Sequence, residues 1–415
     1  MRVLFLCYRG NPFCGGQGIY LYHLTKELAK MGAEIDVLVG PPWPDPIEQW
    51  AFVKRIDNLN LWSVRTKKIP YDKLARVFSP PSNFVDYALT RFHVFPEMEM
   101  FSIRAFFELR TLLKERRYDL IHDVQCLGWG LLPMKGYGIP IVTTVHHPLT
   151  KDRDADFMRN YTFWDYMTTI MFYPLVMQRV VINRLDRVIT SSHEGVGELG
   201  DAFGVKPDKV SVVYNGIDVE AFRNTGERRM ENSLLFVGNT EDHKKGLQYL
   251  FEALAMLPEK ITLTIVDEGP PKRLSAWSVI ERLGLQKRVT FTGKVDMGTL
   301  LHLYSTCTLL VMSSLHEGFG LPAAEAMACE TAVVTTTAGA LKEVVAHGET
   351  GLMAPPMDSK ALAAAVMELM KDRKRREQMG RAGRKRAVEM FSWPVAAKNT
   401  FDVYADVIEK HRRRS

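Results

Sequence analysis

Two glutamates, Glu317 and Glu325, flank the stretch of this chain whose residue types are best suited to hold a ligand. Between them stand Gly318 and Gly320, which let the backbone approach a ligand closely. A carboxylate accepts hydrogen bonds from sugar hydroxyls, whereas the free N–H groups at the start of a helix favour a phosphate. One ligand could therefore contact both glutamates if it carried hydroxyls at one end and phosphate in the middle. A nucleotide sugar has this layout.

The residues around these glutamates predict a strand, a loop and a helix in succession. Residues 309–312 form an apolar run typical of a buried strand, and the polar residues 313–320 predict the loop. Pro322 suits the first helical turn, because its ring presets φ and its missing N–H would have no intrahelical partner there. For an isolated Glu-Gly pair, a plain loop whose glutamate complements the helix dipole would be the simpler interpretation.

A glycine-rich loop, which includes Gly15 and Gly16, follows the first predicted strand, residues 2–7. Its spacing differs from G-x-G-x-x-G, and no Lys-Ser/Thr follows it, so it is neither a dinucleotide fingerprint nor a P-loop. By itself the loop is either a tight turn or a ligand loop. Its place at the first strand–helix junction favours a ligand, because open α/β sheets bind ligands at the carboxyl ends of their strands.

Two histidines, His146 and His147, end the predicted strand 139–145. A histidine there often only caps or packs, and strand alternation points the two rings to opposite faces. The Asp-x-Asp pattern within 152–156 could be taken for a metal site. We interpret it as a charged loop, because Arg153 competes for the carboxylates.

The string from Glu317 to Pro322, followed by Glu325, resembles the donor-site signature of retaining glycosyltransferases of family 4, which have the GT-B fold. The resemblance covers nearly the whole chain, most strongly residues 234–356 and most weakly residues 41–107. It implies that Glu317 contacts the sugar hydroxyls and that Glu325 contacts the ribose. It also implies that backbone groups of the loop contact sugar and phosphate. These are the groups of Gly318, Phe319, Gly320 and Leu321.

The same resemblance assigns roles to other residues at predicted strand ends. It selects His146 as the histidine facing the donor sugar, and it implies that Gly15 and Gly16 contact the diphosphate. Family 4 enzymes usually clamp the donor phosphates with an Arg and a Lys. Lys245 matches the Lys, but Asn239 stands where the Arg is usual. Because Asn carries no charge, phosphate neutralisation should rest more on Lys245, with Lys244 or His243 as candidates to assist it.

Strands alternate with helices along most of the chain, which predicts parallel, doubly wound sheets. Prolines interrupt the pattern in residues 41–107, where basic and aromatic residues mix. This composition has two explanations. The segment could consist of solvated loops and short helices, or it could form a surface that binds a membrane or an acceptor. A regular helix is expected only from about residue 102. Residues 157–182 predict an apolar helix or helix pair. Core packing explains most of it, with a lipid-facing surface as the alternative.

The composition is that of an ordinary globular protein, 46% hydrophobic and 25% charged over 415 residues. The net charge of +6 fits an anionic substrate or a membrane surface and gives no argument for nucleic acid. Five cysteines without a C-x-x-C pair suggest a reduced, cytoplasmic protein. Residues 1–7 lack the features of a signal peptide, and no stretch has the apolar length of a spanning helix.

We therefore predict an α/β protein of GT-B fold, with two Rossmann-like domains facing across a cleft. An acceptor-binding domain, residues 1–208, precedes a nucleotide-sugar donor domain, residues 209–392, and residues 393–415 form a helix that crosses back to the first domain. The expected hexosyltransferase uses a UDP- or GDP-sugar, requires no metal and retains the anomeric configuration. The residues expected to be catalytic are Glu317, His146 and Lys245.

The acceptor is the least constrained part of this prediction. A lipid-linked sugar and a soluble sugar both fit, and the protein would work in the cytoplasm, with or without peripheral contact to the inner face of the membrane. Two alternatives to a transferase stay open. A GT-B sugar-nucleotide epimerase would convert the donor without an acceptor, and the uncharged Asn239 makes a non-catalytic sugar-nucleotide-binding scaffold conceivable.

Overall fold

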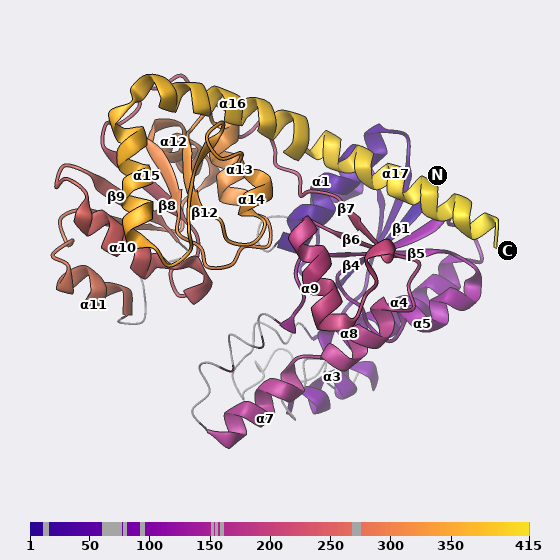
Figure 1. The fold of residues 1–415 in the computed structure, drawn as a ribbon. Helices are drawn as coiled ribbons and strands as arrows, with labels where there is room; N and C mark the ends of the chain where they lie inside the picture. Colours follow the sequence, from indigo (N-terminus) through magenta and orange to yellow (C-terminus); the bar gives the residue numbers. More distant parts are fainter. Residues whose placement is uncertain are drawn as a thin grey trace. The chain divides into compact units, whose positions relative to one another are not determined.

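The computed structural model of this protein consists of two compact units, each with its own parallel sheet (Figure 1). Unit 1 contains Met1–Ser191, Gly195–Val213 and Ala397–Ser415, and unit 2 contains Ser192–Glu194 and Tyr214–Ala396. The residues that the structure describes are 1–10, 16–59, 77, 81–91, 96–150, 153, 157, 162–267 and 275–414. The predicted Gly15 and most of the Asp-x-Asp segment lie outside these residues.

Unit 1 is built on a seven-stranded sheet with the order β3-β2-β1-β4-β5-β6-β7. All its neighbouring strands are parallel. Most of them are short runs of β-branched and apolar residues, the composition of strands covered on both faces. The strands are β1 (Arg2–Cys7), β2 (Glu34–Val39), β3 (Phe52–Arg55), β4 (Leu120–Val124), β5 (Ile141–Val145), β6 (Arg187–Thr190) and β7 (Val210–Val212).

Helices connect these strands as the alternating pattern predicts, and the apolar side chains between them form the core of unit 1. Helix α4 begins at residue 97, several residues before the predicted start, with Pro96 as its N-cap. The helices are α1 (Gly16–Lys30), α3 (Pro81–Arg91), α4 (Glu97–Leu112), α5 (Leu131–Met134), α7 (Phe163–Phe172), α8 (Leu175–Ile182) and α9 (His193–Phe203).

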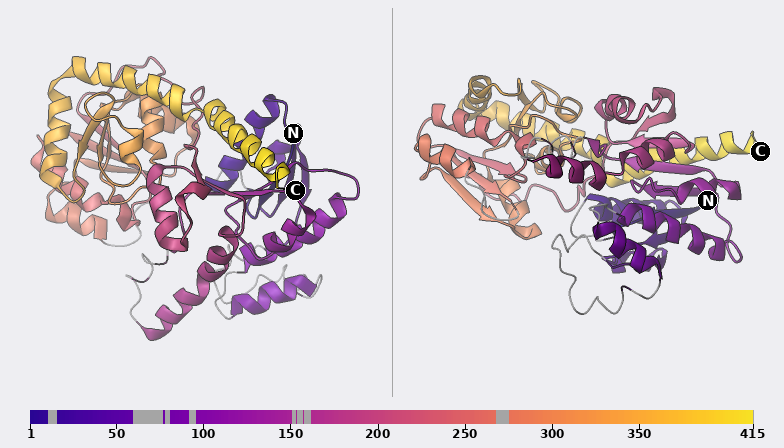
Figure 2. Two further views of the ribbon diagram at one scale, coloured as in Figure 1. Left: turned by 45° about the vertical axis from the view of Figure 1, so that its right-hand side comes forward. Right: turned by 90° about the horizontal axis from the view of Figure 1, so that it is seen from below.

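The prediction that core packing explains residues 157–182 is wrong for the first of two helices in that stretch. Helix α8 buries Met177, Val181 and Ile182, as a core helix should. None of the residues of α7 is buried, and Phe163 and Trp164 are 73% and 74% exposed. Helix α7 extends away from the strands of unit 1 (Figure 1 and the left view of Figure 2).

Unit 2 is built on a six-stranded parallel sheet with the order β10-β9-β8-β11-β12-β13. Among them, β11 is the strand predicted from the apolar run at residues 309–312. The strands are β8 (Ser233–Val237), β9 (Thr262–Val266), β10 (Val289–Gly293), β11 (Leu309–Met312), β12 (Val333–Thr336) and β13 (Gly351–Ala354). The helices are α10 (Leu247–Met256), α11 (Ser275–Arg282), α12 (Met297–Thr306), α13 (Leu321–Ala328), α14 (Leu341–Val344), α15 (Ser359–Lys371) and α16 (Arg373–Phe391).

The last helix, α17 (Trp393–Arg412), has residues in both units. Its first four residues group with unit 2, and the residues from Ala397 onward group with unit 1. The other division between the units falls between Val213 and Tyr214, apart from the short stretch Ser192–Glu194. The sequence placed this division between residues 208 and 209.

Candidate active site

The strand order of unit 2 determines which loops lie side by side. Its first strand, β8, pairs with β9 on one side and with β11 on the other, so the connections run in opposite directions from this point. In open parallel sheets a ligand crevice forms at such a switch point, outside the carboxyl ends of the strands. The loops that follow β8 and β11 carry Lys245 and Glu317.

Lys245 and Glu317 form an ion pair, with Lys245 Nζ lying 2.8 Å from Glu317 Oε2. The Ser314 hydroxyl donates a second hydrogen bond to the same oxygen, at 3.2 Å. The two charged side chains are only 18% and 14% exposed, so water screens their attraction less than that of a surface pair. The structure thus brings together two of the three residues predicted to be catalytic.

Backbone contacts hold the two loops against each other. The Leu315 N–H donates to the Lys244 carbonyl at 2.7 Å, and the Ser313 hydroxyl donates to the Lys245 carbonyl at 2.9 Å. Gly246 follows Lys245 with φ of +60°, and a Cβ on it would lie 2.3 Å from the Ser313 carbonyl oxygen. A glycine is therefore required where the two loops meet.

A glycine after β12, Gly339, supports Glu317 from the other side and was not predicted. Its φ is +54°, and a Cβ there would lie 2.3 Å from the Glu317 carbonyl oxygen. The Ala340 N–H donates to that same oxygen at 2.9 Å. The only sign in the sequence is a glycine in a loop after a predicted strand, which does not reveal the contact with Glu317.

The helix that follows this loop, α13, begins at a backbone suited to an anion. Gly320 is its N-cap with φ of +101°, and no side chain caps the first turn. Pro322 lies in the first turn, as predicted, and Leu321 is 38% exposed. Pro322 has no N–H, and the Ala323 N–H donates to the Gly320 carbonyl at 3.0 Å. The Leu321 N–H, together with the helix dipole, is therefore the feature of this end that suits a phosphate.

Phe319 is part of the predicted donor loop, but its ring is only 4% exposed. The ring centroid lies 5.5 Å from that of Phe391 and 6.1 Å from that of Tyr214. Packing occupies the side chain, so Phe319 can present only backbone groups to a ligand. The neighbouring Gly318 is partly buried in the same loop.

Glu325 lies inside α13, where the hydroxyl of Tyr304 donates to its Oε2 at 2.8 Å. Burial raises the pKa of Glu325 to about 7, and the Tyr304 hydrogen bond opposes that shift. Tyr304, fully buried on α12, was not predicted as a neighbour of this glutamate. Asn239, which stands in place of the usual Arg, is exposed, and its Oδ1 accepts a hydrogen bond from the Glu241 N–H at 2.8 Å.

In unit 1, His146 directly follows β5, and Gln125 and Tyr20 are in contact with it. The buried Gln125 accepts a hydrogen bond from the His146 N–H at 3.0 Å and donates to the His147 carbonyl at 2.9 Å. The Tyr20 ring meets the His146 ring edge to face, with centroids 4.7 Å apart. Neither Gln125 nor Tyr20 was predicted. Gly16, the other predicted residue described in this unit, is exposed at the start of α1.

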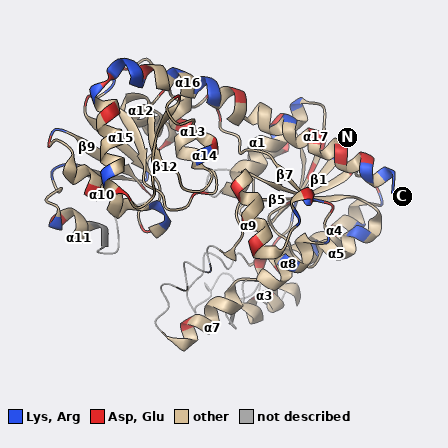
Figure 3. Cartoon of the chain, viewed as in Figure 1, with Lys and Arg blue, Asp and Glu red and all other residues tan. Residues whose placement is uncertain are grey.

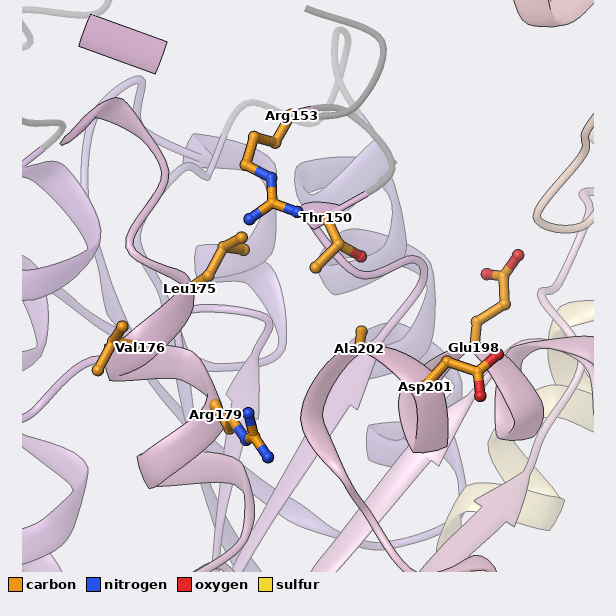
Figure 4. A pocket seen from close by; sticks show the side chains of 8 residues that line it. All are labelled: Thr150, Arg153, Leu175, Val176, Arg179, Glu198, Asp201 and Ala202. Carbon is orange, nitrogen blue, oxygen red and sulfur yellow. The ribbon is translucent and has the colours of Figure 1, made fainter. Parts of the chain in front are cut away.

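A cavity of about 380 Å³ lies between α8, α9 and the segment after β5, and no predicted site residue lines it. Arg179 lies on one wall and Asp201 on the opposite wall, beside Glu198 (Figure 4). Guanidinium and carboxylate groups together can hydrogen-bond hydroxyls as donors and acceptors. The lining residues are Thr150, Arg153, Leu175, Val176, Arg179, Glu198, Asp201 and Ala202.

Two family models together match most of this chain. The profile described as Glycosyltransferase Family 4 matches residues 14–221, and that described as Glycosyl transferases group 1 matches residues 218–386. The chain belongs to glycosyltransferase family 4. This membership confirms the family expected from the loop sequence. The protein is therefore an enzyme that transfers glycosyl groups.

Relatives of this family 4 chain span nearly its whole length. It is 33% identical over 421 residues to the MMP α-(1→4)-mannosyltransferase of Mycolicibacterium hassiacum, covering 99% of each chain. It is 27% identical to the glycogen synthase of Mycobacterium tuberculosis, covering 97% of this chain and 94% of that one. Transfer of a glycosyl group is therefore better supported than an epimerase or a scaffold.

Solved structures confirm the GT-B fold of the family 4 chain. Sucrose-phosphate synthase from Thermosynechococcus elongatus superposes with a TM-score of 0.71 at 22% identity, over 99% of this chain and 100% of that one. Anabaena HepE in complex with UDP superposes with a TM-score of 0.70 at 20% identity, over 98% and 100%. At these identities the likeness establishes the fold alone.

Proposed function

We propose that this family 4 enzyme moves a hexosyl group from a nucleotide-diphosphate sugar to an acceptor hydroxyl with retention of the anomeric configuration. The observation that carries the proposal is the Lys245–Glu317 pair beside the uncapped start of α13. An ammonium group, a carboxylate and the start of a helix, all in neighbouring loops, match the phosphates and hydroxyls of a sugar nucleotide.

In this proposal the protein lowers the barrier mainly by stabilising the departing diphosphate. Lys245 neutralises charge that develops on the leaving group, and the Leu321 amide with the dipole of α13 adds preorganised stabilisation. Glu317 and His146 orient the sugar, while Glu325 holds the ribose. The acceptor oxygen then bonds to the anomeric carbon from the face that the diphosphate leaves, and its proton passes to the departing phosphate oxygen, so the configuration is retained. No step requires a metal ion.

The proposed donor is a GDP- or UDP-activated hexose, with mannose favoured. The similarity to a mannosyltransferase over 99% of the chain supports mannose. Nucleotide release from a panel of UDP-, GDP- and ADP-sugars, without acceptor, would identify the donor. We expect slow release from one donor, unchanged by EDTA and lost in Glu317→Ala. Equal release by the variant would contradict the assigned site.

The acceptor is proposed to bind unit 1, at or near the cavity lined by Arg179 and Asp201. A lipid-linked and a soluble saccharide both present hydroxyls that such walls could bind. The enzyme is proposed to work in the cytoplasm, with peripheral contact to an anionic membrane through α7. No helix in the described part of the chain has the length and apolar character needed to cross a membrane.

A further inference from the structure

A buried circuit of polar side chains joins α17 to the sheet of unit 1. His122 Nδ1 on β4 hydrogen-bonds the Tyr404 hydroxyl of α17, and His122 Nε2 lies 2.8 Å from Thr144 Oγ1 on β5. Thr144 Oγ1 lies 3.0 Å from the Tyr20 hydroxyl of α1. The Tyr20 hydroxyl also hydrogen-bonds the Thr400 side chain, one turn before Tyr404 on α17. The circuit therefore begins and ends on the same helix.

The members of this circuit are deeply buried. The protonation state of His122 therefore decides which group of each hydrogen bond is the donor. His122 and Tyr404 are 0% exposed, and burial lowers the pKa of His122 to about 3. A neutral imidazole has one donor and one acceptor nitrogen, and each hydroxyl donates once. The hydrogen bonds can then all run in one direction around the circuit, an arrangement in which each bond strengthens the next.

The circuit is in contact with His146 through Tyr20. The Tyr20 ring stands at 81° to the His146 ring, with centroids 4.7 Å apart. Thr144 lies on β5, two residues before His146. The hydrogen bonds of the Tyr20 hydroxyl therefore determine where its ring lies against His146.

We propose that Tyr20, His122 and Thr144 are positioning residues for His146, and that the seating of α17 on unit 1 sets the orientation of the His146 ring through them. Helix α17 has residues in both units. The proposed contacts couple the packing of its unit 1 residues to the ring orientation of His146. The proposal rests on the role in glycosyl transfer proposed above for His146.

Substitutions on α17 test the coupling at a distance in sequence from the site. Tyr404→Phe and Thr400→Val each remove one hydroxyl of the circuit and keep the shape of the side chain. We expect each to lower turnover about tenfold while the KM for the donor stays within about twofold. Val407→Ala is the matched control, because Val407 is also buried on α17 but lies outside the circuit. It should lower stability without lowering turnover.

A double-mutant cycle separates positioning from general damage. In a His146→Ala background, Tyr404→Phe should cost less than about twofold, because its effect acts through the missing ring. An equal loss in both backgrounds would overturn the proposal. Thr144→Ser, which keeps the hydroxyl, should retain turnover that Thr144→Val loses, and equal turnover of these two variants would also overturn it.

An NMR measurement distinguishes failure of this inference from failure of the proposed function. If His146→Ala leaves turnover unchanged, the proposed role of His146 is wrong, and the ring signals of His146 then test the circuit alone. We expect the ring-proton shifts of His146 to change in Tyr404→Phe and to stay unchanged in Val407→Ala. Unmoved His146 signals in a folded Tyr404→Phe variant would refute the coupling.

Discussion

Lys244 and Lys245 are neighbours in sequence, but their ammonium groups have different surroundings. Lys245 Nζ lies 2.8 Å from Glu317, whereas Lys244 Nζ lies 3.9 Å from Asp242 within its own turn. We expect Lys245→Ala to lower turnover at saturating donor at least about a hundredfold, because it removes the preorganised positive charge that stabilises the leaving group. Lys244→Ala is the control and should stay within about threefold of the wild type. Near-normal turnover of Lys245→Ala would remove Lys245 from the mechanism.

Gly339 offers a second test at the scale of single residues. Gly339 and Gly348 both have positive φ, +54° and +83°, but only at Gly339 would a Cβ approach another atom within 4 Å. Both alanine variants should lose about 1 kcal/mol of unfolding free energy from the backbone conformation. Gly339→Ala should in addition displace Glu317 and lower turnover more than about tenfold. Urea unfolding and donor turnover measured on both variants check this, and equal turnover would contradict the proposed support.

At the scale of elements, α8 and α9 form the walls of the cavity of unit 1. Arg179→Ala removes a guanidinium from this cavity. We expect the KM for the acceptor to rise about tenfold or more, because a hydrogen bond to a charged group contributes about that much to binding. Donor hydrolysis without acceptor should be unchanged. Arg184→Ala is the control, because Arg184 hydrogen-bonds the Val180 carbonyl and does not line the cavity. A rise in the KM for the donor instead would show that Arg179 acts on donor binding and not on the acceptor.

Helix α7 presents its apolar side chains to solvent, the reverse of an ordinary surface helix. It contains a single charged residue, Asp165, and it is almost without charge colour in Figure 3, whereas Lys and Arg gather along α16. Exposed aromatic side chains of this kind are typical of membrane-interface helices. We expect flotation with anionic vesicles to fall several-fold in Phe163→Ser/Trp164→Ser. Met297→Ser, at a residue of unit 2 that is 57% exposed, should leave flotation unchanged.

At the scale of the whole molecule, two adjacent residues of β4 give opposite dependences of stability on pH. Burial lowers the pKa of His122 from 6.5 to about 3, so the unfolded chain binds the proton first and stability falls as the pH drops below 6.5. Burial raises the pKa of Asp123 from 3.8 to about 6, so the folded chain binds that proton first and stability rises as the pH drops below 6. The two effects largely cancel near pH 4.5.

Removing one of these residues should reveal the other. Between pH 7 and pH 4.5 each contributes about 2 to 3 kcal/mol, with opposite signs. On going from pH 7 to pH 4.5, we expect the unfolding free energy of His122→Gln to rise relative to that of the wild type. That of Asp123→Asn should fall relative to the wild type. Urea unfolding at both pH values measures this. Parallel changes in the two variants would show that burial does not shift these groups in opposite directions.

The amino-acid sequence by itself determined the fold class and the secondary structure around the donor loop. The apolar run at 309–312 became β11, and Pro322 lies in the first turn of α13. These features depend on residues close together in the chain, namely apolar runs, glycine freedom and the restricted φ of proline. The sequence was a poorer guide to α7, because an apolar helical pattern alone does not show whether a partner covers it.

Only the tertiary structure decided which side chains meet. Lys245 and Glu317 are 72 residues apart, and they pair because β8 and β11 are neighbours at the switch point of the sheet. The contacts of Gly339 with Glu317, of Tyr304 with Glu325 and of α17 with His122 have the same origin. Strand order brings distant loops and helices together, and no local pattern of residues records that order.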